Sequence, residues 1–97
     1  MRHLLRTAMI SRVKIEGRTL RAVVQDIVNQ VEAADGKGRK LSVVFSSQKL
    51  GEKTQVVFGN PPVEGTAEHA LYLVGADFNC YFSGVEERTI LCSEDPP

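Results

Sequence analysis

The stretch TLRAVVQDIVNQVEA, residues 19–33, decides the fold of this chain. Its apolar residues recur at intervals of three and four, so they form one stripe along a helix. The stripe consists of Leu20, Val23, Val24, Ile27, Val28 and Val31. Thr19 is a suitable N-cap, because its hydroxyl can accept from an amide of the first turn. We predict an amphipathic helix that ends near Asp35 and Gly36, where glycine can adopt the left-handed conformation.

Strand patterns flank this helix. Residues 12–15 alternate charged and apolar side chains, which predicts a first strand. Residues 41–45 and 55–58 are rich in β-branched and aromatic side chains, which predicts a second and a third strand, antiparallel to each other. Pro61 and Pro62 then end the third strand.

A second helix is expected directly after the prolines, with an end at Gly75 or Asp77. One face of it would carry Val63, Ala67, Ala70, Leu71 and Val74. Residues 78–82 and 88–92 then predict a final hairpin. The fold class is therefore α+β, in the order β-α-β-β-α-β-β, with both helices packed on one face of small mixed β-sheets.

A chain of 97 residues has room for a single domain. We assign that domain to residues 13–93 and expect residues 94–97 to form a frayed tail. Residues 1–12 have no regular pattern and form a leader that is disordered, a short extra helix or vector-derived sequence. The leader is not a secretory signal as it stands, and no apolar run reaches the roughly 20 residues that span a bilayer. The chain is thus cytoplasmic, or a piece of a longer protein.

Several segments, taken in order, resemble a known family. They are TLRAVV from residue 19, LSVVF from 41, LGEK from 50, QVVF from 55, PVEGTA from 62, GADFNCY from 75 and TIL from 89. Together they resemble the short N-terminal domain of secretins and TonB-dependent receptors, known as the STN domain. The long connection over 32–40 and the pair Gly65-Thr66 depart from the family pattern.

This resemblance implies a periplasmic, outer-membrane-associated setting. In that setting the domain would contact inner-membrane or substrate proteins during secretion or pilus assembly, or would pass a signal to a regulator. It also implies a protein partner, possible assembly within a larger parent and no cofactor.

No arrangement of residues in the chain predicts catalysis or metal binding. His3 and His69 lack further ligands at metal-binding spacing, and no serine lies in a nucleophile motif. Cys80 and Cys92 fall on the two arms of the final hairpin, where a register centred on Glu86 would place them opposite each other. They are either a disulfide or two buried thiols. We therefore predict a protein that is not an enzyme and has no metal site.

The residues favour binding through an open strand edge, whose unpaired amides and carbonyls can add a partner's strand. The candidate edge residues are Leu41, Val43, Phe45, Gln55 and Val57. The alternative is a small nucleic-acid-binding domain that uses its sheet, with Tyr81 and Phe82 exposed, and the basic loop from Lys37 to Lys40. Twelve basic residues balance twelve acidic ones, which argues against that alternative.

Overall fold

The helix expected over residues 19–33 is α2 (Leu20–Ala34) of the computed structural model, which describes residues 2–36, 38, 40–54, 62–86 and 88–96. The Thr19 hydroxyl accepts from the Ala22 amide at 3.1 Å, so the predicted N-cap is confirmed. All six residues of the apolar stripe are buried. The Asp35 amide donates to the carbonyls of Val31 and Glu32, which ends the helix where the sequence predicts.

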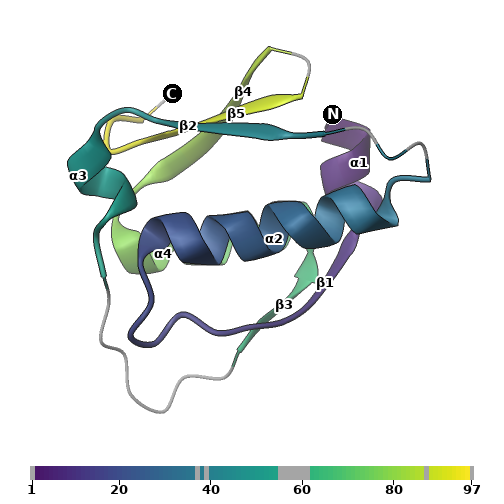
Figure 1. The fold of residues 1–97 in the computed structure, drawn as a ribbon, viewed down its shortest axis with the longest axis horizontal. Helices are drawn as coiled ribbons and strands as arrows, with labels where there is room; N and C mark the ends of the chain where they lie inside the picture. The colour runs from purple at the N-terminus through teal and green to yellow at the C-terminus, as the bar shows by residue number, and fades with distance from the viewer. Residues whose placement is uncertain (1, 37, 39, 55–61, 87, 97) are drawn as a thin grey trace.

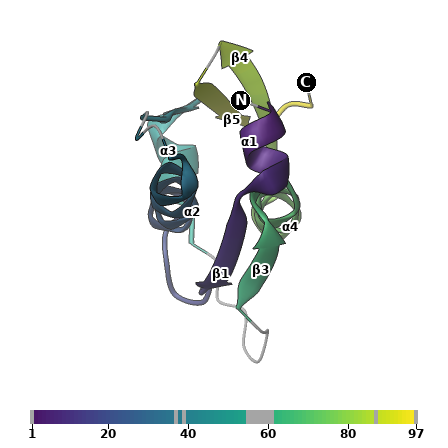
Figure 2. The same cartoon turned by 90° about the vertical axis from the view of Figure 1, so that its right-hand side faces the viewer.

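Two small sheets enclose the helices in the described part of the chain. The first contains β2 (Ser42–Phe45), β5 (Thr89–Ser93) and β4 (Tyr81–Glu86) in that order, with β2 parallel and β4 antiparallel to the central β5. The second pairs β1 (Met9–Val13) antiparallel with β3 (Val63–Thr66). In Figure 1 the three-stranded sheet lies above α2 and the two-stranded sheet below it. Figure 2 shows α2 and α4 (Ala67–Phe78) side by side beneath the larger sheet.

The α+β class is confirmed, and four helices occur among the described residues. Two short helices, α1 (Arg2–Thr7) and α3 (Gln48–Gly51), are added to the expected order. The strand predicted over 55–58 lies outside the described residues. The third described strand is instead β3, which pairs with β1 and not with β2.

The second helix begins later than the sequence suggested. Val63 was expected on its inner face but lies in β3. Gly65 has a φ of 122°, which no right-handed helix contains, and the Thr66 hydroxyl accepts from the His69 amide at 3.2 Å as an N-cap. The helix also extends beyond Gly75 to Phe78, where Asn79 adopts the left-handed conformation with a φ of 59°.

The N-terminal segment is part of the folded domain. Residues 2–7 form a helix, which was one of the alternatives for the leader, and β1 starts at Met9 instead of residue 12. Ala8 and Ile10 are buried in the core, and Leu4 and Leu5 pack against it. The domain therefore begins before residue 13. At the other end, residues 94–96 are exposed and lie outside any strand.

Candidate protein-binding edge

The strand β2 has a neighbour on one side among the described residues. The amides of Ser42 and Ser46 donate to the carbonyls of Arg88 and Cys92, each at 2.9 Å. In a parallel pair, alternate residues turn their amides and carbonyls toward the same neighbour. The backbone groups of Val43 and Phe45 therefore face away from β5, and no described strand pairs with them. We call Val43–Phe45 the open edge.

The five predicted edge residues have different positions. Val43 and Phe45 lie on the open edge with half-buried side chains that pack against the core. Leu41 precedes β2, and its amide already donates to Glu32 Oε2 at 2.7 Å. Leu41 therefore does not offer a free amide to a partner. Gln55 and Val57 lie outside the described residues.

The helix α2 borders the open edge with polar side chains. At one end, the Arg21 guanidinium lies over the Phe45 ring, 4.6 Å from its centroid. In the middle, Gln25 Nε2 donates to Asn29 Oδ1 at 2.9 Å. At the other end, Glu32 holds the Leu41 amide. A segment added to β2 would lie next to this polar stripe.

The sequence shows only that Arg21 lies outside the apolar stripe of the predicted helix. Nothing in the order of the residues indicates that Arg21 meets Phe45, which is 24 positions further along the chain and on another element. The repeat of polar residues at spacings of three and four is the one signal in the sequence that could have pointed to this stripe.

The opposite edge of the three-stranded sheet, which β4 forms, has an irregular strand pairing. In β4 the register with β5 shifts between Gly84 and Glu86, which is a β-bulge or a similar irregularity. Bulges interrupt a strand edge and hinder its pairing with another chain. The described residues of β2 contain no bulge, no proline and no charged side chain. Within the described residues, the open edge therefore lacks the bulge, the proline and the charge that often protect an edge strand.

The outer face of the three-stranded sheet presents Ser42, Val44, Tyr81, Ser83, Thr89, Leu91 and Ser93. Val44 is 50% exposed and Tyr81 is 48% exposed, whereas Phe82 packs against the core on the inner face. Tyr81 and Phe82 thus point to opposite faces and do not form the joint aromatic surface that the nucleic-acid alternative needs.

The basic loop is only partly described. Lys37 and Arg39 lie outside the described residues. Lys40 Nζ is 3.9 Å from Glu32 Oε1, so the positive charge of this lysine faces a carboxylate.

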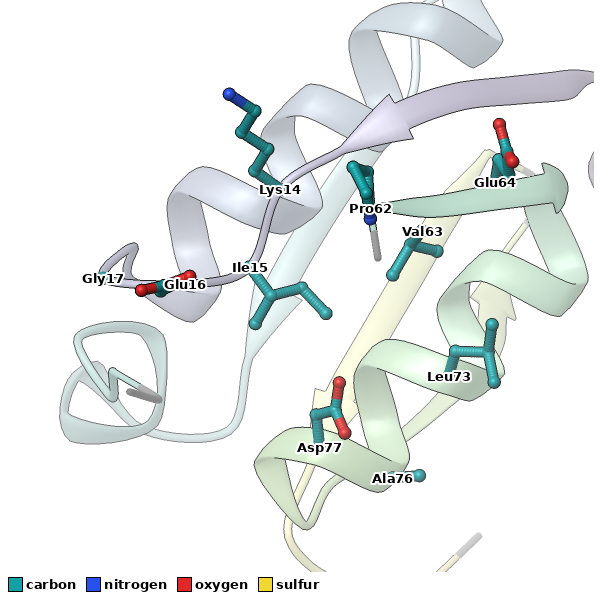
Figure 3. Close-up of a pocket in the computed structure, with 10 residues that line it drawn as sticks. All are labelled: Lys14, Ile15, Glu16, Gly17, Pro62, Val63, Glu64, Leu73, Ala76 and Asp77. Carbon is teal, nitrogen blue, oxygen red and sulfur yellow. The ribbon is translucent and has the colours of Figure 1, made fainter. Parts of the chain in front are cut away.

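A groove of about 1000 Å³ lies at the end of the two-stranded sheet, between the connection that follows β1 and helix α4 (Figure 3). Its described lining is Lys14, Ile15, Glu16, Gly17, Pro62, Val63, Glu64, Leu73, Ala76 and Asp77. Figure 3 shows its three acidic side chains on three different segments. The described lining contains no histidine, cysteine or serine.

The cysteines are in contact inside the core. Both thiols are free and buried, and Cys92 Sγ donates to Cys80 Sγ at 3.6 Å. The residue opposite Cys92 is Phe82, so Cys80 lies diagonally across the hairpin and not opposite, as the register centred on Glu86 required. This hydrogen bond from Cys92 lowers the pKa of Cys80 against the effect of burial, and it raises the pKa of Cys92 together with burial.

The described residues contain neither a metal-binding cluster nor a membrane-spanning helix. In the described residues, no group of three or more histidine, cysteine, aspartate or glutamate side chains could hold a metal ion. His69 is exposed on α4 and lies next to Gly65. Within the same residues, no helix is long and apolar enough to cross a membrane.

Comparisons with protein-family models, with curated proteins and with solved structures give no match to this chain.

Proposed function

We propose that the chain is a non-catalytic protein-interaction module that binds an extended segment of a partner protein as an added strand beside β2. The observation that carries this proposal is the open edge, where the amides of Val43 and Phe45 face away from β5. Main-chain hydrogen bonds supply the affinity in this mode of binding, and side chains next to the added strand supply the specificity.

The position of α2 favours a single strand over a second copy of the domain. α2 runs alongside β2 beneath the sheet (Figures 1 and 2). If two copies paired edge to edge, their α2 helices would be forced together, because neighbouring strands lie about 4.8 Å apart whereas packed helices need about 8–10 Å. An extended segment without a helix meets no such obstacle.

The biological setting that we propose is that of the N-terminal domain of a secretin or TonB-dependent receptor in the periplasm. The resemblance of the ordered segments supports it. The order β1, α2, β2, β3, α4, β4, β5 is of the expected type once the two short helices are left aside, although β3 is formed by Val63–Thr66 and not by the predicted strand over 55–58. A single strand addition is a weak contact, and repetition around a ring would strengthen it.

Proline substitutions at neighbouring positions test the strand addition. Val43→Pro removes an amide that faces away from β5, so we expect a folded protein that no longer accepts an added strand. Val44→Pro is the matched control. It removes an amide that faces β5, and we expect it to be less stable than Val43→Pro by about 2 kcal/mol in urea denaturation.

The binding probe is a set of strand-length peptides selected from a display library on the wild-type chain. We expect these peptides to slow hydrogen exchange at the Val43 and Phe45 amides and to lose binding to Val43→Pro. Peptides that bind Val43→Pro as tightly as wild type would contradict the proposal. So would a library that yields no binder, or peptides that protect only amides outside β2.

A further inference from the structure

Arg21 is held at one end of the open edge. Its guanidinium carbon, Cζ, lies over the Phe45 ring, 4.6 Å from the ring centroid. On α3, the space beside Gly51 is filled by the same group, because a Cβ on Gly51 would lie 2.6 Å from Arg21 Nη2. Figure 1 shows the start of α2, the end of β2 and α3 together at one end of the molecule. The fold thus fixes a cation at the end of β2.

The hydrogen-bond donors of Arg21 are not used by a carboxylate among the described residues. Three other arginines in that part of the chain each pair with one. These pairs are Arg6 with Glu68, Arg18 with Asp26 and Arg88 with Asp35. Arg21 is exposed, and its guanidinium lies against the Phe45 ring and beside Gly51.

The hydrogen-bond donors of Arg21 lie beside the position that a strand added to β2 would occupy. Phe45 lies opposite the fully buried Cys92 of β5, whereas the guanidinium over its ring is exposed. A planar guanidinium suits bidentate binding of a carboxylate, and stacking on a ring keeps that plane oriented.

We propose that Arg21 selects the partner: the segment added to β2 is acidic and carries an aspartate or glutamate side chain next to Phe45, where its carboxylate pairs with the Arg21 guanidinium. This inference rests on the proposed strand addition, because the added backbone is what brings the carboxylate to Arg21. It assigns a chemical class to the partner.

The test uses the full chain and the same library of strand-length peptides, with capped ends so that no terminal carboxylate contributes. We expect the selected peptides to share one acidic position. The amide analogue of that residue should bind wild type about tenfold more weakly, and Arg21→Gln should cause a loss of similar size. The two losses should not add when they are combined, because both remove the same pair.

Two further variants separate this role from a structural one. Gly51→Ala keeps the charge and suits a helix, but its methyl group displaces the guanidinium from Phe45, so binding of acidic peptides should weaken. Arg12→Gln removes an exposed arginine of β1 and should leave binding unchanged. Circular dichroism should show that both variants are folded.

The outcomes distinguish the inference from the proposed function. Selected peptides without a shared acidic residue, or peptides that bind Arg21→Gln as tightly as wild type, would overturn the role of Arg21. If those peptides still lost binding to Val43→Pro, strand addition would stand. Peptides that bind Val43→Pro normally, or a library that yields no binder, would overturn both.

Discussion

The Cys80–Cys92 contact gives the core a pair of thiols that differ in chemistry. Because Cys92 donates the hydrogen bond and Lys53 adds a favourable charge effect, the pKa of Cys80 is lowered, and Cys80 is the thiol that ionises first. A thiolate is the form that attacks a disulfide. Cys80 is therefore the attacking residue in any exchange with an oxidised small thiol.

We predict that excess oxidised glutathione converts this pair into an internal disulfide when local opening of the final hairpin exposes Cys80, which is 5% exposed in the closed fold. The Cys80 thiolate displaces one glutathione thiol to form a mixed disulfide, and Cys92 then displaces the second. Mass spectrometry should show the loss of two hydrogens, faster as the pH rises because more Cys80 is ionised. Cys92→Ser should stop at the mixed disulfide with Cys80. Native protein that keeps both thiols after long incubation would contradict the prediction.

The cysteine contact also shows what a sequence can say about single residues. The chain order places Cys80 and Cys92 on two arms of a hairpin, and that much is correct in outline. The register depends on where β4 begins, and this in turn depends on α4 continuing to Phe78. A helix end that is fixed by packing cannot be read from the glycine at position 75.

At the scale of the elements, Gly75 allows close packing of α4 against the segment that follows it. Gly75 does not mark the C-terminus of the helix. A Cβ on Gly75 would lie 2.6 Å from the Cys80 carbonyl oxygen, which is backbone and cannot swing aside. We predict that Gly75→Ala destabilises the protein by about 1–3 kcal/mol in urea denaturation, despite the better helix propensity of alanine. Gly36→Ala is the control, since a Cβ there meets nothing within 4 Å. Equal stability of the two variants would show that α4 can shift to admit the methyl group.

The elements differ in how well the sequence predicts them. The sequence predicts both ends of α2 almost to the residue, because its apolar stripe, its N-cap and its C-terminal residues all indicate the same helix. β3 is missed, because Val63 fits a helical pattern with Ala67 and Ala70 equally well. Only the backbone at Gly65 and the cap at Thr66 decide between strand and helix there.

For the whole molecule, the sequence gives the class but not the pairing of strands. Ser42 pairs with Thr89, and no local pattern indicates that two segments so far apart lie in parallel. The open edge follows from this pairing, so residues 41–45 could be predicted as a strand but not as one with a free side. The pairing of β1 with β3 in the two-stranded sheet likewise joins segments that are far apart in the sequence, and no local pattern indicates it.

The N-terminal helix contributes to the stability of the whole domain. Leu4 and Leu5 are half-buried and pack against the core. We predict that removal of residues 1–7 leaves a folded protein that is about 1–2 kcal/mol less stable in urea denaturation. Tyr72→Ala should change stability little, since Tyr72 is 73% exposed on α4. A truncated protein as stable as wild type would show that α1 adds nothing to the fold.

The central place of β5 in the larger sheet has a consequence for synthesis of the protein. Translation proceeds from the N-terminus, so the ribosome delivers β5 after every other described element. Until residue 93 has left the exit tunnel, neither β2 nor β4 has a neighbour among the described strands. The nascent chain therefore exposes a short apolar strand with both edges free, at the stage when aggregation competes most strongly with folding. A chaperone that shields extended apolar segments would act on residues 42–45 during that interval.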